Sequence, residues 1–90
     1  MTDRRDVYKA IDSERDYQSR LWNDETTTSG GLHSLEEWLV YMDDYLRQAK
    51  EQLSRNAKQV ADPLALATIR KITAMGVCCM EQHGAPHRTT

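Results

Sequence analysis

The chain has 90 residues and a mass of 10.4 kDa, which suffice for one small domain with a thin core. Its 12 basic and 14 acidic side chains give a formal net charge of −2. This balance argues against a non-specific nucleic-acid binder, because such proteins carry a basic excess. A mean hydropathy of −0.76 and apolar runs of only a few residues predict no membrane span.

Two further features bear on the compartment. No apolar run follows Arg4 and Arg5, so the N-terminus does not resemble a signal peptide. Cys78 and Cys79 are adjacent in the sequence and cannot close a distant loop with a disulfide. We therefore expect a single domain over residues 1–90 in a reducing compartment, the cytoplasm.

The first predicted element is a peripheral helix over residues 3–22. Val7, Ile11 and Leu21 suggest an apolar stripe, which the polar residues 12–16 interrupt. The segment that follows, residues 23–33, is polar and glycine-rich, and we expect it to form a mobile loop.

The second predicted element is a helix over residues 35–57. Ser34 and Glu37 have the spacing of a capping box, in which each side chain bonds the backbone of the other residue. Apolar residues then recur every three or four positions, as on one face of a helix. These residues are Leu35, Trp38, Leu39, Met42, Leu46, Ala49 and Leu53.

The third predicted element is a helix over residues 63–83. Asp62-Pro63 is a helix start signal, and Gly84 a stop signal, before a frayed tail over 85–90. Apolar residues cover more than half of this helix, so it should be buried on several sides, in part by another copy of the chain. The sequence thus predicts an all-α fold: a three-helix antiparallel bundle or hairpin that oligomerises through its third helix.

Four carboxylates on the second helix are candidate ligands for Mg²⁺, which prefers oxygen ligands. They form two pairs, Glu36 with Asp43 and Glu37 with Asp44, each a heptad apart. The alternative is a solvated helix face with acidic residues near its N-terminus. A zinc site at Cys79 and His83 is a weaker hypothesis, because only two ligands align.

Phosphate binding is suggested by Arg70 and Lys71, a basic pair within the apolar third helix. Near the end of the first helix, cations, an amide and aromatic rings lie close in sequence, a combination that can hold a phosphate and stack on a base. These residues are Arg15, Tyr17, Gln18, Arg20 and Trp22. The alternative is a set of surface cations and interface aromatics. His33 could close an anion site at a helix N-terminus, or pack against Trp38.

Several of these segments together resemble a family of small helical proteins common in tailed bacteriophages. The matching residues are Glu14-Arg15-Asp16-Tyr17-Gln18 with Trp22, His33-Ser34 with Glu37-Trp38, Tyr41 with Tyr45, Ile69-Arg70-Lys71-Ile72, and Met80 to Pro86. More distantly, the arrangement resembles the all-α nucleoside triphosphate pyrophosphohydrolases of the MazG type. That resemblance implies Mg²⁺ held by a Glu-x-x-Glu pair and a further acidic pair. Here Leu39 follows Glu36 after three positions, and Arg70-Lys71 stands on the next helix.

Our first functional hypothesis is a non-enzymatic helical oligomer that binds a small phosphorylated, nucleotide-like ligand at subunit interfaces and needs no cofactor. In the infected bacterial host that the resemblance implies, it would sequester a nucleotide signal of host defence. Arg15, Arg70 and Lys71 would hold phosphates, and Tyr17, Trp22 or Trp38 would stack on the base. A Mg²⁺-dependent nucleotide pyrophosphohydrolase and a host-protein-binding module are the alternatives.

Overall fold

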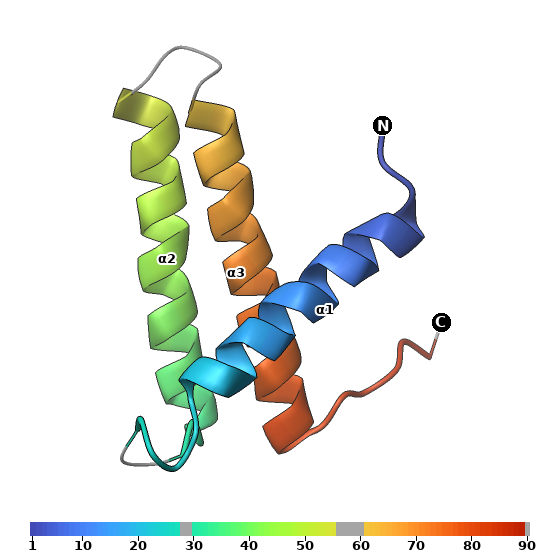
Figure 1. Cartoon of the computed structure of the whole chain (residues 1–90), viewed down its shortest axis with the longest axis vertical. Coiled ribbons are helices and arrows are strands. Elements are labelled where there is room, and N and C mark those ends of the chain that lie inside the picture. Colours follow the sequence, from blue (N-terminus) through green and yellow to red (C-terminus); the bar gives the residue numbers. More distant parts are fainter. Residues whose placement is uncertain (28–29, 56–60, 90) are drawn as a thin grey trace.

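The computed structural model describes residues 1–27, 30–55 and 61–89, apart from the side chains of residues 54–55 and 61–62. These residues form three helices, α1 (Arg4–Leu21), α2 (Leu35–Arg55) and α3 (Ala61–His83), and no strand (Figure 1). The predicted all-α class and the three predicted helices are therefore confirmed. Each helix end that falls on described residues lies within two residues of its predicted position.

Local signals explain where α1 and α2 begin. The Asp3 carboxylate accepts a hydrogen bond of 2.8 Å from the Arg5 N–H and caps α1. At the start of α2, the Glu37 N–H donates to Ser34 Oγ at 3.1 Å, and the Ser34 N–H donates to Glu37 Oε1 at 2.9 Å. The predicted capping box is thus present in both directions.

Helix α3 begins at Ala61, two residues before the predicted start. The sequence predicts Asp62 as the N-cap of this helix, but Asp62 lies within the helix, so that prediction is wrong. The helix ends at His83, and Gly84 follows with a φ of +121°. Residues with a Cβ rarely adopt this backbone conformation, whereas glycine adopts it readily. The predicted glycine stop is therefore confirmed, and the described tail, residues 85–89, has no regular structure.

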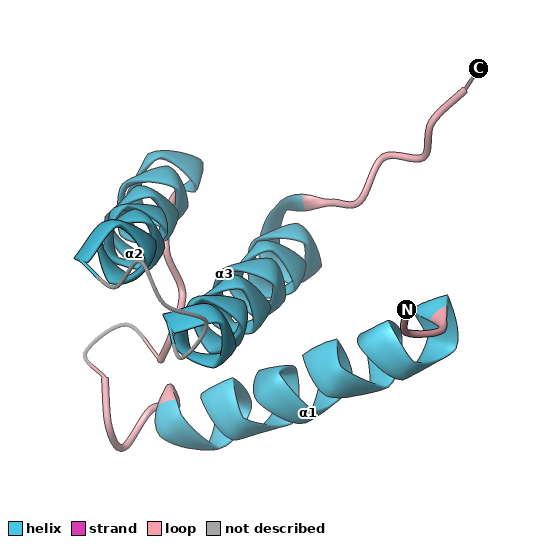
Figure 2. Cartoon of the chain, turned by 90° about the horizontal axis from the view of Figure 1, so that it is seen from above, coloured by secondary structure: helices cyan, strands magenta, loops and turns pink. Residues whose placement is uncertain are grey.

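Helix α3 is the central element of the fold. Helix α2 runs antiparallel beside it, and α1 crosses α3 obliquely on another side, so that α3 lies between its two neighbours (Figures 1 and 2). The prediction that the third helix packs on more than one side is confirmed for these contacts within the chain. Trp38, Met75 and Cys78 form the buried cluster between the helices.

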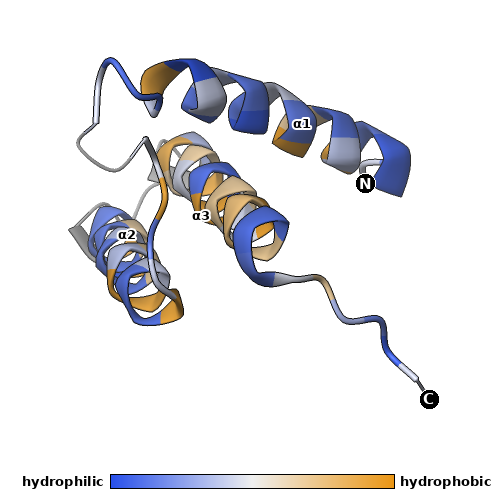
Figure 3. Cartoon of the chain, turned by 90° about the horizontal axis from the view of Figure 1, so that it is seen from below, coloured by the Kyte–Doolittle hydropathy of each residue, from blue (hydrophilic) through white to orange (hydrophobic). Residues whose placement is uncertain are grey.

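The three helices differ in polarity, as the colouring in Figure 3 shows, with α1 largely hydrophilic and α3 largely hydrophobic. Residues Pro63–His83 of α3 are long and apolar enough to cross a membrane, with a mean hydropathy of 1.3 over their most apolar stretch. This corrects the expectation that no segment reaches that length. A core helix of a globular domain can have the same composition, and α1 and α2 pack against α3, although only 22% of this apolar stretch is buried within the chain.

The described part of the segment predicted as a mobile loop contains hydrogen-bonded turns. The Asn23 side chain accepts a hydrogen bond from the Glu25 N–H at 2.8 Å and donates one to the Arg20 carbonyl at 2.8 Å. Gly31 is buried with a φ of +84°, and a Cβ there would lie 2.9 Å from the Trp22 carbonyl oxygen. Glycine at this position therefore lets the chain pass close to the end of α1.

Candidate ligand-binding site

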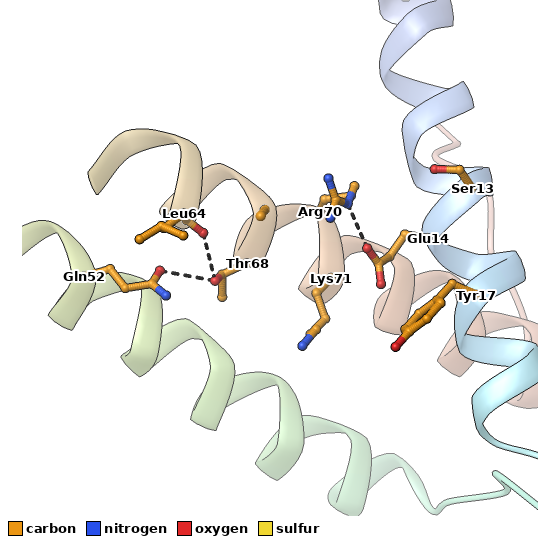
Figure 4. A pocket seen from close by; sticks show the side chains of 9 residues that line it. Ser13, Glu14, Tyr17, Gln52, Leu64, Thr68, Arg70 and Lys71 are labelled. Atoms are coloured by element: carbon orange, nitrogen blue, oxygen red, sulfur yellow. Dashed lines mark hydrogen bonds and ion pairs between the residues drawn. The ribbon is translucent and has the colours of Figure 1, made fainter. Parts of the chain in front are cut away.

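Two neighbouring cavities lie on one side of α3. The first, which we call the polar cleft, has a volume of about 500 Å³ and receives side chains from all three helices (Figure 4). Its lining consists of Ser13, Glu14 and Tyr17 of α1, Gln52 of α2, and Leu64, Ala67, Thr68, Arg70 and Lys71 of α3. The second, which we call the aromatic cavity, has about 190 Å³ and is lined by Trp22, His33, Trp38, Tyr41, Tyr45 and Met75.

Lys71 connects the two cavities. Its side chain is half-buried and lines the polar cleft, while its Nζ lies 4.7 Å from the centre of the Tyr45 ring in the aromatic cavity. Figure 4 shows the Lys71 ammonium and the Tyr17 hydroxyl directed into the same space. In the described part of the chain, Lys71 forms no ion pair with a carboxylate. A partly desolvated cation without a carboxylate is suited to receive an anionic group.

The neighbouring cation, Arg70, already has a partner. Its Nε donates to Oε1 of Glu14 at 2.7 Å, and the Glu14 side chain is only 9% exposed. The pair forms one wall of the polar cleft. The sequence predicts that Arg70 holds phosphate, but Glu14 largely offsets its charge. Of the two neighbouring cations, Lys71 is therefore the one available to bind a phosphate.

Arg15 and Gln18 lie between α1 and α3 and do not line either cavity. Arg15 pairs with Glu81 of α3, and the buried Gln18 amide donates to the Lys71 carbonyl at 3.2 Å. One atom of each side chain, Arg15 Nη1 and Gln18 Oε1, is buried without a hydrogen-bond partner among the described residues. These two predicted ligand contacts therefore serve to dock α1 against α3 within a single chain.

Trp22, His33 and Trp38 do come together, as walls of the aromatic cavity. The His33 ring lies edge-on to Trp38 and to Tyr41, with 5.0 Å between ring centres in both pairs, and Trp22 lies 6.1 Å from Trp38. His33 thus packs against Trp38, as one of its two interpretations predicted, while also facing the cavity. Trp38 is 1% exposed, so Trp22, Tyr41 and Tyr45 offer the accessible ring surfaces.

Gln82 holds this cavity in shape and was not predicted as a functional residue. Its Oε1 accepts hydrogen bonds from Trp38 Nε1 at 2.9 Å and from the His33 N–H at 3.2 Å. Its Nε2 donates to the Gly31 carbonyl at 2.8 Å. A single amide of α3 therefore fixes both the indole of α2 and the loop that carries His33.

The four candidate magnesium ligands do not gather. Residues seven apart on a helix are separated by about 10 Å along its axis, too far for the two carboxylates of either pair to share one ion. Glu37 is engaged in the capping box, Asp44 pairs with Arg47 at 2.8 Å, and Glu36 and Asp43 face solvent. Among the residues that the structure describes, no three His, Cys, Asp or Glu side chains are placed to hold a metal ion.

Of the two predicted zinc ligands, Cys79 is half-buried, and Nε2 of His83 lies 2.7 Å from the His33 carbonyl oxygen. The neighbouring Cys78 offers little for metal binding or nucleophilic chemistry. Cys78 is buried, and burial raises the pKa of its thiol, an effect that the positive charge of Arg15 opposes only in part. A neutral buried thiol is a poor metal ligand and a poor nucleophile.

Nine lining residues were not predicted as site residues: Ser13, Glu14, Tyr41, Tyr45, Gln52, Leu64, Ala67, Thr68 and Met75. A signal for three of them was present, because Tyr41, Tyr45 and Gln52 recur at spacings of four and seven on one side of α2. The sequence gave no such signal for Thr68. Its hydroxyl donates to the Leu64 carbonyl, a bond that threonines in many helices form and that marks no site.

Comparison of the chain with protein-family models, with curated proteins and with solved structures finds no match.

Proposed function

We propose that this protein binds a small phosphorylated ligand with an aromatic ring, such as a nucleotide, without converting it chemically. The observation that carries the proposal is the position of Lys71. Its ammonium lies at the junction of the polar cleft and the aromatic cavity, without a carboxylate partner among the described residues. One ligand could therefore place its phosphate against this cation and its ring among the aromatic side chains.

The phosphate end would lie in the polar cleft. Lys71 supplies up to three N–H donors, and the Tyr17 hydroxyl faces the same space. With Arg70 offset by Glu14, the charged groups lining the cleft sum to about one positive charge, which favours an anion. Helices α1 and α3 thus supply the polar contacts.

The ring of the ligand would lie in the aromatic cavity. Trp22 and Tyr45 are half-buried and Tyr41 is partly exposed, so each keeps ring surface on which a planar group can stack. Stacking of a base on an aromatic side chain contributes about 1–3 kcal/mol. Because the hydrogen bonds of Gln82 fix one wall in advance, little conformational entropy is lost on binding.

Binding without turnover is favoured over hydrolysis by the arrangement of the acidic residues. The carboxylates at 36, 37, 43 and 44 stay apart on α2 and do not line either cavity. In the phage setting that the sequence resemblance implies, a protein that holds a nucleotide without cleaving it would act by sequestering a host signal.

Titration with a panel of linear and cyclic nucleotides, followed by native mass spectrometry and calorimetry, tests the proposal. We expect Lys71→Ala to lose about 1.5–3 kcal/mol of binding free energy, which is roughly a ten- to hundredfold weaker affinity. Lys9→Ala is the matched control, because Lys9 is an exposed lysine of α1 that lines neither cavity.

Equal affinities of the Lys71→Ala and Lys9→Ala proteins would contradict the assignment of the site. Metal-dependent release of a monophosphate, lost in Glu37→Gln, would instead favour the pyrophosphohydrolase. No binding of any nucleotide would favour a module that binds a host protein.

A further inference from the structure

The side of the α2–α3 hairpin that faces away from the two cavities carries large apolar side chains with no cover in the chain. Each of them is between 43% and 67% exposed. They are Leu39, Leu46 and Leu53 of α2 and Leu66, Ile69 and Met80 of α3, and we call this surface the outer face. The two rows meet in a groove of about 240 Å³ lined by Leu53, Ala65, Leu66 and Ile69.

The outer face is distinct from the site described above. Leu46 and Leu53 directly follow Tyr45 and Gln52, which line the cavities, and successive residues point about 100° apart around a helix. On α3, Ile69 follows the cleft residue Thr68 in the same way. None of the six side chains of the outer face lines either cavity.

Both rows have the heptad spacing that pairs helices. On α2, the positions 39, 42, 46, 49 and 53 alternate by three and four residues, with Met42 and Ala49 turned toward α3 and the leucines left outside. On α3, the positions 66, 69, 73, 76 and 80 follow the same alternation. Such seams are typical of helices that pack lengthwise against other helices.

We propose that a second copy of this chain covers the outer face, with its α2 antiparallel to α2 and its α3 antiparallel to α3. The two-fold axis would run perpendicular to the helices and pass near Leu46 and Thr73. The product is a four-helix core in which all neighbouring helices are antiparallel.

The register of α2 supports this axis. Antiparallel pairing about Leu46 places Leu39 of one copy opposite Leu53 of the other, because each lies seven residues from the axis. The same pairing brings Asp43, three residues before the axis, near Lys50 of the second copy, four residues after it. Both charged side chains are exposed beside the apolar row. The surface is therefore complementary to itself in shape and in charge, as an isologous contact requires.

The register of α3 supports a two-fold axis at the same position. Pairing about Thr73 places Leu66 opposite Met80, each seven residues from the axis, and Ile69 opposite Val77, each four residues from it. The contacts Trp38–Gln82 and Thr68–Gln52 join α2 and α3 at both ends of the hairpin. Their midpoints, residues 45 and 75, put Leu46 and Thr73 within about 2 Å of the same height. A single axis therefore serves both helices.

A further cavity is placed to accept the second copy. It has about 380 Å³ and lies between the N-terminal half of α1 and the α3 row, with Val7, Ala10, Leu66 and Ile69 among its lining. Because Met80 of the second copy lies opposite Leu66, its flexible side chain can fill this space. Half-exposed Val7 would then be covered as well.

Sedimentation velocity and native mass spectrometry test this pairing. We expect the wild-type chain to sediment as a dimer of twice 10.4 kDa. We expect the Leu46→Glu protein to be a monomer with unchanged helix content, because the substitution places two carboxylates next to each other at the two-fold axis. Leu46 is 43% exposed within one chain, so the charge leaves the fold of the chain intact. Leu32→Glu, on an exposed leucine outside this surface, is the matched control and should remain dimeric.

A charge-reversal cycle tests the register. Asp43→Lys and Lys50→Asp should each weaken the dimer about tenfold, and the double variant should restore it. Failure of the double variant to restore the dimer would overturn the register. A monomeric wild type would overturn the proposal, and its co-sedimentation with phosphatidylcholine vesicles would assign the outer face to a membrane. An assembly that keeps its mass in Leu46→Glu would also overturn it.

Discussion

Glu37 illustrates how a single side chain acquires its role from its nearest neighbours. Hydrogen bonds from the Ser34 backbone N–H and from the Ser34 hydroxyl hold the pKa of Glu37 below its ordinary value of 4.5, and the charge of His33 adds a smaller effect in the same direction. The ionised form is therefore favoured by the folded chain, as expected of an acid in a capping box at a helix N-terminus.

This lowered pKa predicts a pH dependence for the stability of the protein. Because the pKa is lower in the folded than in the unfolded chain, the stabilisation is present above pH 4.5 and is lost as the pH falls through the folded value. Glu37→Gln keeps the capping geometry but cannot titrate there. We expect the difference in melting temperature between the wild-type and Glu37→Gln proteins to shrink from pH 7 to pH 3. A difference that stays constant over this range would show that the ionisation of Glu37 contributes nothing to stability.

At the scale of single residues, the sequence predicts what depends on neighbours along the chain. The capping box and the glycine after α3 follow from local backbone geometry, and both are confirmed. The partners of Arg70 and Gln82 lie about fifty residues away, so no spacing rule could pair them with Glu14 or Trp38. For this reason the sequence suggests Arg70 as a phosphate ligand and gives no sign of the contacts that Gln82 makes.

At the scale of whole elements, α1 differs from the other two helices in how it is held. One large apolar side chain, Ile11, is buried from α1, and the remaining docking contacts are polar. They are Glu14 with Arg70, Arg15 with Glu81, and Gln18 with the Lys71 carbonyl. Polar contacts of this kind offset their own desolvation only narrowly, so α1 should be the least firmly held helix.

The Glu14–Arg70 pair allows this weakness to be measured. Arg70→Met leaves a nearly buried carboxylate without its cation, and we expect the amides of α1 to exchange their hydrogens about tenfold faster, with those of α2 unaffected. Arg47→Met, which breaks the exposed pair with Asp44, is the matched control. Adding Glu14→Gln to Arg70→Met should slow the exchange again. Uniform acceleration in all three helices would show instead that α1 unfolds only with the whole chain.

The existence of the three helices follows from the spacing of their apolar residues, and the α2–α3 hairpin from the short connection between two long stripes. The oblique path of α1 cannot be predicted from the sequence in this way. Its apolar stripe is weak, so its crossing angle on α3 is determined by polar contacts between residues far apart in the chain. The polar cleft depends on that crossing, because Ser13, Glu14 and Tyr17 of α1 line it. The sequence therefore predicts six of the fifteen residues that line the two cavities, but not how the predicted site residues divide between the cavities and the contact of α1 with α3.

At the scale of the whole molecule, the proposed ligand site and the proposed pairing surface lie on different sides of the α2–α3 hairpin. The two cavities of the proposed site are lined by side chains of one chain, whereas the sequence-based hypothesis puts the ligand between subunits. If both proposals hold, each chain binds one ligand whether or not it is paired.

This independence predicts that Leu46→Glu, although monomeric, binds nucleotide with the affinity of the wild-type protein and with one ligand per chain. Calorimetry gives both quantities in one titration. A stoichiometry of one ligand per two chains, or loss of binding in the monomer, would place the ligand at the contact between copies.

The aromatic cavity also gives the protein an internal optical probe. The chain has two tryptophans, Trp22 and Trp38, and both line this one cavity. All of its tryptophan emission therefore originates beside the proposed ring-binding position. A base stacked there would quench the intrinsic fluorescence directly, so ligand occupancy could be followed in the unmodified protein, with no label and no reporter substitution.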